Sequence, residues 1–128
     1  MSRENELSEI IVDAALKVHR ELGPGLLESV YEGVLEFELR KRGHEVERQK
    51  PIAVEYEELK IEDSFRADLV VEDKVIIELK SVERMEKVHK KQLLTYIRLA
   101  DIRLGLLINF GLPLLKDGLV RMVNGLEE

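Results

Sequence analysis

The chain of 128 residues has no cysteine and no tryptophan, and aromatic residues make up only 5% of it. Without cysteine there is no disulfide scaffold, no thiolate nucleophile and no cysteine-ligated zinc or iron–sulfur site. Three histidines are present, but His19, His44 and His89 lack the spacing of zinc ligands, so a histidine-based zinc site is not expected. The longest segment without a charged residue, 104–115, is too short for a membrane-spanning helix, which takes about 20 apolar residues.

Acidic residues outnumber basic ones. There are 26 Asp and Glu against 20 Lys and Arg, which gives a formal net charge of −6. This balance argues against non-specific coating of nucleic acid, because such binding relies on many contacts between basic side chains and phosphates. It leaves room for a small acidic metal site that acts on a phosphodiester. The N-terminal segment lacks the apolar core of a signal peptide. We therefore expect a soluble, cytoplasmic protein with no membrane partner and a single domain over residues 1–128.

Hydrophobic periodicity predicts a sheet with helices packed on it, in the α/β or α+β class. A first helix runs to Leu22 and is ended by Gly23-Pro24-Gly25. A second helix covers 26–42, with its main apolar stripe on Leu27, Val30, Tyr31, Val34 and Phe37. We expect the order ααββββαββ, in which the later strands and the third helix include the segments 52–56, 65–71, 75–80, 85–100, 104–108 and 119–123.

Two of these strands, joined by the hairpin-length loop 72–74, carry the most informative polar residues. In this register Asp68 lies opposite Glu78, and directly opposed residues share a face with their Cβ atoms about 5 Å apart. Lys80, two residues after Glu78, points to that face too. Neighbouring carboxylates repel unless a cation lies between them, and Mg²⁺ prefers such oxygen ligands. The other interpretation is that Lys80 simply pairs with these acids on a solvated sheet face.

The second predicted helix places an acid at the start of an apolar line. Glu28 precedes Tyr31, Leu35 and Leu39 at helical spacing. An acid in the first turn of a helix stabilises the helix dipole, which by itself explains Glu28. Tyr31 is likewise explained as a core aromatic residue with a hydrogen-bonded hydroxyl. The residue pattern alone therefore leaves both a structural and a functional role open for these two side chains.

The third predicted helix places an amide on an apolar line. Gln92 shares a face with Val88, Tyr96 and Leu99. A buried amide must find hydrogen-bond partners, so Gln92 either satisfies a carbonyl group of the core or holds a water or substrate at a site. The same helix begins with a basic run, 87–91, which either attracts phosphate or is simply solvated.

Several segments resemble the GxxExxY family. Gly25-Leu-Leu-Glu28-Ser-Val-Tyr31 matches its signature, and Leu22-Gly-Pro-Gly and Leu107-Ile-Asn-Phe-Gly111 are also similar to it. That family is placed among the PD-(D/E)xK nuclease-like proteins. The resemblance covers nearly the whole chain and implies a restriction-endonuclease-like core, in which a central mixed β-sheet flanked by helices bears the pattern Asp…(Asp/Glu)-x-Lys on a hairpin.

The resemblance implies a role for each polar residue of the hairpin. Asp68 would be the first acid of the pattern, and Glu78 and Lys80 its (Asp/Glu)-x-Lys. Asp68, Glu78 and the backbone carbonyl of Leu79 would hold the metal, Mg²⁺ or Mn²⁺. Lys80 would position the attacking water and help to deprotonate it. No other cofactor is implied.

The helices would complete this site. Glu28 would be the helix acid of the family and would bind a second ion or its water. Gln92 and Tyr96 resemble the Gln-x-x-x-Tyr motif of the RecB-type exonuclease branch. Gln92 would orient the substrate or the surroundings of Lys80, and Tyr31 and Tyr96 would support the site.

Taken with the resemblance, these residues predict a Mg²⁺- or Mn²⁺-dependent nuclease that acts on DNA more than on RNA. The alternative is a non-catalytic nucleic-acid- or protein-binding module that keeps the nuclease fold, and the net charge of −6 favours this alternative. Because an acidic chain of this size needs a grip on DNA from somewhere, we also expect a homodimer or a partner protein that supplies extra DNA contacts. A structural sheet protein with an incidental Glu-Lys pair is the third possibility.

Overall fold

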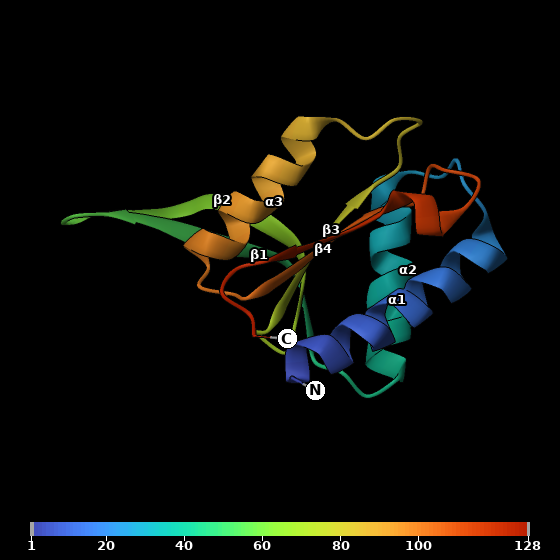
Figure 1. Cartoon of the computed structure of the whole chain (residues 1–128), viewed down its shortest axis with the longest axis horizontal. Helices are drawn as coiled ribbons and strands as arrows, with labels where there is room; N and C mark the ends of the chain where they lie inside the picture. The colour runs from blue at the N-terminus through green and yellow to red at the C-terminus, as the bar shows by residue number, and fades with distance from the viewer. Residues whose placement is uncertain (1, 128) are drawn as a thin grey trace.

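The computed structural model describes residues 2–127 and shows a five-stranded mixed sheet with helices on both faces (Figure 1). The expected fold class, a mixed sheet flanked by helices, is confirmed. In this range no helix is long and apolar enough to cross a membrane. The elements in chain order are α1 (Arg3–Leu22), α2 (Glu28–Lys41), β1 (Val46–Tyr56), β2 (Leu59–Val71), β3 (Val75–Lys80), α3 (Lys87–Leu99), β4 (Leu104–Asn109), the 3-10 turn η1 (Leu115–Gly118) and β5 (Leu119–Val123).

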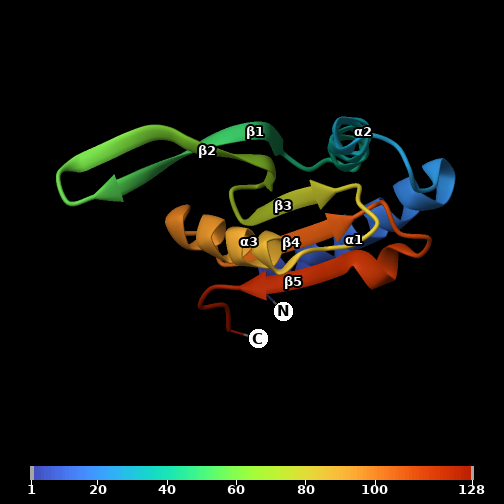
Figure 2. The same ribbon diagram turned by 90° about the horizontal axis from the view of Figure 1, so that it is seen from above.

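Three strands, not the expected four, precede α3 in the described part of the chain. β1 is longer than expected at its start, where residues 46–51 pair with residues of β2, and β2 is longer than expected at the turn, where its first residues pair with the end of β1. Val54 lies opposite Ile61, and Tyr56 lies opposite Leu59. No segment was assigned to the fourth strand, and the described residues before α3 form only β1, β2 and β3. Figure 2 shows the end of this hairpin projecting from the body of the sheet as an arm.

The order of strands in the sheet follows their order in the chain, β1-β2-β3-β4-β5. Neighbouring strands are antiparallel except β3 and β4, which are parallel. A parallel pair needs a crossover connection, and α3 supplies it. The crossover carries α3 over one face of the sheet, while α1 and α2 cover the other face (Figure 1).

Each face of the sheet contributes to its own apolar core. Ile77 of β3 packs into the core that contains α1 and α2, whereas Ile76 packs with Leu93 and Ile97 of α3. Successive residues of a strand point to opposite faces. Because both faces are covered, β3 reads as a nearly continuous apolar run. Glu78 comes two residues after Ile76, so its side chain points to the α3 face.

The main apolar stripe expected on α2 is largely exposed. Leu27 is 74% exposed and Phe37 is 65% exposed. The buried line of α2 has the same helical spacing as the predicted stripe. A prediction from apolar residues alone therefore chose the more exposed of the two lines. Two buried acids on the other line are tolerated because each has a basic partner, Arg48 for one and Lys17 for the other. The residues that α2 buries are Tyr31, Glu32, Leu35, Glu38 and Leu39.

The turn between α1 and α2 is held by Tyr31. Gly23 has a φ of +72°, in the left-handed region that favours glycine. The hydroxyl of Tyr31 donates a hydrogen bond to the carbonyl oxygen of Gly23 over 2.5 Å and accepts one from the N–H of Leu26 over 3.1 Å. Its ring stacks on Phe110, with the ring centroids 4.5 Å apart. One buried side chain therefore ties the turn to the core and helps to set where α2 begins.

Replacing Tyr31 by Phe should lower the free energy of unfolding by about 1–3 kcal/mol, because the carbonyl of Gly23 and the N–H of Leu26 lose their partner. Urea unfolding followed by circular dichroism measures this change. The matched control is Tyr56→Phe, at a tyrosine of the arm that is 69% exposed, and it should change the same quantity by less than about 0.5 kcal/mol. Identical unfolding curves for the wild type and Tyr31→Phe would show that the hydroxyl does not hold the turn.

Candidate active site

The hairpin of β2 and β3 brings Asp68 and Glu78 together. Its ladder pairs Leu69 with Ile77 and ends there. At the next position the N–H of Asp68 donates to Oε2 of Glu78 over 2.8 Å, and the N–H of Leu79 donates to Oδ2 of Asp68 over 2.9 Å. The side chains thus take the place of further ladder bonds and are held where the two strands part. This is the register expected from a short hairpin loop.

Burial and the neighbouring Asp68 change the ionisation of Glu78. The pKa of Glu78 is raised to about 8, chiefly by burial and then by the negative charge of Asp68. The N–H of Asp68 and the positive charge of Lys80 act in the opposite direction. Burial also raises the pKa of Tyr96, and the charges of Glu78 and Asp68 add to this effect. At neutral pH the metal-free pair therefore keeps a proton, and Tyr96 of α3 lies within electrostatic reach of it.

Lys80 lies beside this pair at the end of β3. It is partly buried, and it shares the α3 face with Glu78 because the two residues are two positions apart. Its carbonyl oxygen accepts a hydrogen bond from the N–H of Phe110 over 2.8 Å, which ties the end of β3 to the end of β4. Three of the residues expected from the sequence, Asp68, Glu78 and Lys80, are thus gathered at one place.

α2 directs a different acid toward the pair from the one expected. Gln49 of β1 donates through Nε2 to Glu32 Oε1 over 2.9 Å and to Asp68 Oδ1 over 3.3 Å. Glu32 also accepts a hydrogen bond of 2.6 Å from Nε of Arg48. Burial raises the pKa of Glu32, the bond to Arg48 opposes this, and the charge of Asp68 raises it further. Glu32 and Gln49 are therefore site residues that sequence reasoning missed.

Only one of these two residues left a signal in the sequence. Glu32 lies three residues before Leu35 and seven before Leu39, so an acid on the buried line of the helix was visible. Gln49 lies in a polar run of β1 with a φ of +55°, and no periodicity marks it. Its position opposite Asp68 follows from the register of β1 and β2, which pairs Arg48 with Leu69.

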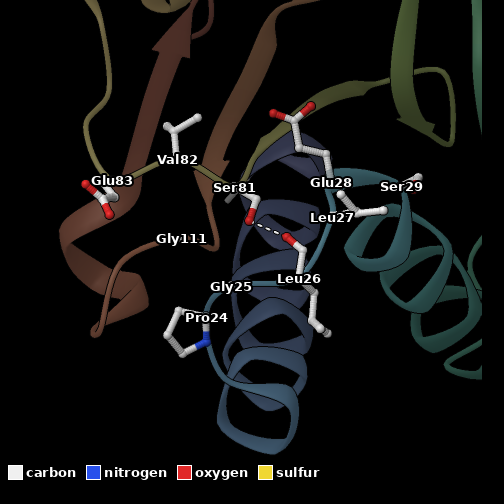
Figure 3. A pocket seen from close by; sticks show the side chains of 10 residues that line it. All are labelled: Pro24, Gly25, Leu26, Leu27, Glu28, Ser29, Ser81, Val82, Glu83 and Gly111. Carbon is white, nitrogen blue, oxygen red and sulfur yellow. Dashed lines mark hydrogen bonds between the residues drawn. The ribbon is translucent and has the colours of Figure 1, made fainter.

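Glu28 lies in a neighbouring pocket of about 770 Å³. Figure 3 shows its carboxylate projecting from the start of α2 into the space beside Ser81, which directly follows Lys80. Ser81 Oγ donates to the carbonyl oxygen of Leu26 over 2.5 Å and so joins the end of β3 to the α1–α2 turn. Glu28 is exposed, and no hydrogen bond between described residues links it to Asp68 or Glu78. The structure thus places Glu28 in a pocket at the end of β3 that neither Asp68 nor Glu78 lines.

The apolar line expected on α3 is also displaced. Val88 is 52% exposed and Leu99 is 42% exposed, and Gln92 is exposed as well, so Gln92 is not a buried amide of the core. α3 instead buries Leu93 and Ile97, which have the same spacing.

Tyr96 lies at the edge of the buried line of α3. It is partly buried and stacks on Phe65 of β2, with the ring centroids 3.9 Å apart. The structure therefore brings Tyr96 to the pair. Gln92, one turn earlier, lies on the solvent side of the same helix. Tyr31 supports the surrounding structure from the α1–α2 turn without a direct bond to the pair.

The donor set at the pair suits a hard divalent cation. Asp68 and Glu78 offer carboxylate oxygens, and their mutual repulsion is relieved when a cation lies between them. The N–H of Leu79 points to Asp68, and the carbonyl of the same strand residue points to that side too. Residues 2–127 hold no cluster of three or more His, Asp or Glu suited to a metal ion. Mg²⁺ commonly takes one or two carboxylates with waters, so the residues present fit it.

A mixed sheet with helices on both faces, and a hairpin that presents Asp68, Glu78 and Lys80, defines a restriction-endonuclease-like α+β fold. A family model described as the PD-(D/E)XK nuclease superfamily matches residues 5–122, and the chain belongs to this superfamily. Searches of curated proteins and of solved structures found no significant match. The resemblance to the GxxExxY family stays a prediction from the motif residues.

In metal-free buffer the stability of the wild type should fall as pH rises from about 5 to 8. Glu78 keeps its proton in the folded state up to a pKa of about 8 but loses it near 4.5 when the chain is unfolded. The free energy of unfolding therefore falls as pH rises through this window. Glu78→Gln cannot ionise. It should be more stable than the wild type by roughly 2 kcal/mol at pH 8.5 and about equally stable at pH 5, as guanidinium unfolding measures.

The control for this experiment is Glu83→Gln, at an exposed glutamate of the loop after β3. It should leave the pH dependence of the wild type unchanged, because it does not touch the pair. If Glu78→Gln gained no stability at pH 8.5, burial and the charge of Asp68 would not raise the pKa of Glu78 as stated above.

Proposed function

We propose that this protein is a Mg²⁺- or Mn²⁺-dependent nuclease that hydrolyses phosphodiester bonds, in DNA rather than RNA. The observation that carries the proposal is the pair of acids Asp68 and Glu78, held by two backbone hydrogen bonds beside Lys80. Membership of the PD-(D/E)XK nuclease superfamily supports the same chemistry. These three residues occupy the polar positions of the pattern after which the superfamily is named.

Asp68 and Glu78 would hold the ion, with the carbonyl oxygen of Leu79 as a further ligand. When bound, the ion supplies Lewis-acid chemistry, because it lowers the pKa of water and neutralises charge that develops on the phosphate. Glu78 must lose its proton first, so binding of the ion strengthens as pH rises toward 8. The backbone hydrogen bonds already hold both side chains, which limits the rearrangement needed on binding.

Lys80 would position the attacking water, help to deprotonate it and oppose the negative charge that grows on the phosphate. Tyr96, stacked on Phe65, would keep this cluster ordered. Gln92 lies one turn earlier on α3 and is exposed, which suits contact with the substrate better than contact with Lys80.

α2 would contribute the remaining acids. Glu32 is linked to Asp68 through Gln49, so it would tune the charge of the pair from the buried side. Glu28 faces the pocket beside the end of β3, from which it would bind a second ion or its water. Tyr31 would support both acids, because its hydroxyl helps to set where α2 begins.

Asp68→Asn and Lys80→Ala should each reduce metal-dependent cleavage of DNA at least about 100-fold without unfolding the protein, because one removes an ion ligand and the other removes the positioned ammonium. Cleavage of plasmid and of labelled linear duplex in Mg²⁺ and in Mn²⁺ measures the effect, and circular dichroism confirms folding. The matched controls are Asp101→Asn and Lys74→Ala. Both residues are exposed, and they come before the starts of β4 and β3, away from the end of β3 that carries the pair. Equal cleavage by the wild type and both site variants would refute the proposal.

A non-catalytic binding module that keeps the nuclease fold is the second candidate function. The net charge of −6 favours it, and so do the backbone hydrogen bonds that satisfy both carboxyl groups without an ion. Such a module would bind nucleic acid or another protein. Nucleic acid as the partner, with a homodimer or partner protein that adds DNA contacts, is part of the nuclease proposal, and a cytoplasmic location is proposed under either function.

Calorimetric titration with Mn²⁺ at pH 8.5 separates the two candidates, because Glu78 is largely ionised there. A nuclease should bind Mn²⁺, and the binding should disappear in Glu78→Ala but persist in Glu83→Ala. No binding up to millimolar Mn²⁺ would favour the module instead.

A further inference from the structure

The arm carries an apolar face that lies outside both cores of the molecule. Val54 pairs with Ile61 and Tyr56 pairs with Leu59, and residues directly opposite each other in a ladder share a face. We call these four residues the arm face. Tyr56 is 69% exposed, Leu59 58% and Ile61 50%. A two-stranded hairpin is only marginally stable in water on its own, so the arm is stabilised by a partner that covers this face.

The arm face points to the side of the sheet on which α3 lies. Ile52 and Phe65 pair with each other at the base of the arm and pack into the core that contains α3. Val54 and Tyr56 follow Ile52 at intervals of two residues along β1, so they point the same way. Figure 2 shows the arm extending past the end of α3. α3 therefore covers the base of the arm and leaves the arm face open beyond it.

The tip of the arm carries two acids that the fold does not pair. Elsewhere on the arm charges pair within the chain, as Lys60 does with Glu62 over 3.5 Å. Glu57 and Glu58 form the turn between β1 and β2 and are exposed. Between residues 2 and 127 neither takes part in an ion pair. Their negative charge is therefore available to a basic surface.

The outer side of α3 offers the complementary chemistry. At 3.6 residues per turn it lies opposite the buried residues Leu93 and Ile97. Its members are exposed, and neighbouring members are three or four positions apart, so they adjoin on the helix surface. No ion pair in the described part of the chain involves a cation of α3. We call this surface the outer face of α3, and it consists of Val88, Lys91, Thr95, Arg98 and Leu99.

The two surfaces also match in length. Lys91 and Arg98 are about 10 Å apart along the helix axis, at about 1.5 Å per residue. Val54 and Glu57 are about 10 Å apart along the arm, at about 3.3 Å per residue. An arm that lies along α3 of another molecule can therefore place its apolar residues and its tip acids on one helix at the same time.

A second copy of the chain satisfies both surfaces at once. The arm face and the outer face of α3 belong to the same side of the sheet. When two copies turn these sides toward each other about a two-fold axis, the arm of each copy meets α3 of the other, as a self-complementary interface requires. The arm face then packs on Val88 and Leu99, and the tip acids approach Lys91 and Arg98.

Other partners fit only one of the two surfaces. A nucleic acid would be repelled by the arm, which carries five acids and two bases between residues 55 and 66. An acidic protein would suit α3, which has four Lys and Arg residues and no acid, but it would also be repelled by the arm. A basic protein would suit the arm and be repelled by α3. This chain already carries both surfaces in one molecule.

We propose that the protein forms a two-fold homodimer in which the arm of each copy lies on the outer face of α3 of the other copy. The proposed function leaves open a homodimer or a partner protein, and the two surfaces select the homodimer. Asp68, Glu78 and Lys80 belong to neither surface, so the dimer does not depend on cleavage.

Sedimentation velocity of the full chain, in EDTA and without nucleic acid, tests the dimer. The wild type should sediment as a dimer. Glu57→Lys/Glu58→Lys and Lys91→Glu/Arg98→Glu should each raise the dissociation constant on the order of 100-fold, because like charges then face each other. An equimolar mixture of these two variants should recover the dimer, because each arm then meets an α3 of opposite charge. Circular dichroism checks that both variants are folded.

The control is Glu9→Lys/Glu21→Lys, which makes the same charge change at exposed acids of α1, on the other side of the sheet. It should keep the dissociation constant of the wild type. A monomeric wild type, an equal loss in the control, or a mixture that stays monomeric would each overturn the dimer.

The proposed function is tested separately by cleavage. If the mixture recovers the dimer but the wild type cuts nothing in Mg²⁺ or Mn²⁺, the dimer stands and the nuclease proposal fails. If the wild type cuts DNA but sediments as a monomer, the nuclease proposal stands and the dimer fails.

Discussion

The exchange of hydrogen bonds between Asp68 and Glu78 is the constraint on which the candidate site depends. Like charges directly opposite each other in a sheet destabilise it. Here each carboxyl group accepts a backbone N–H from the hairpin, Glu78 from Asp68 and Asp68 from Leu79, and Glu78 keeps its proton up to a pKa of about 8. Because the side chains replace ladder bonds, β2 can leave β3 without orphaned N–H groups. The point at which β2 and β3 separate is therefore also the point at which Asp68 and Glu78 are held.

The charged residues near the pair differ between the α2 side and the α3 side of the sheet. On the α2 side the buried acid Glu32 is balanced by Arg48 and connected to Asp68 through Gln49. On the α3 side Tyr96 borders the pair, and the cations of that helix are exposed. A protein with a net charge of −6 thus combines a negative centre with one positive helix.

Sequence reasoning succeeded where the structure is local. The short loop and the apolar run of β3 predicted the register that pairs Leu69 with Ile77 and so brings Asp68 to Glu78. Sequence reasoning failed where two sets of residues on one helix had the same spacing, so that the spacing did not show which set is buried. The β1–β2 hairpin is longer than the two segments predicted for it, and the fourth strand expected before α3 is not found among the described residues. On α2 and α3 the predicted apolar lines run beside the buried ones, which left Leu27 and Gln92 exposed.

By itself, then, the amino-acid sequence determined most of the helices and strands and the meeting of Asp68, Glu78 and Lys80, because residues within one hairpin have few ways to pair. Only the tertiary structure decided that Glu32, and not Glu28, is the acid of α2 linked to the pair. The rotation of a helix about its own axis is set by what it packs against, and for α2 those partners lie elsewhere in the chain, among them β1 and β3.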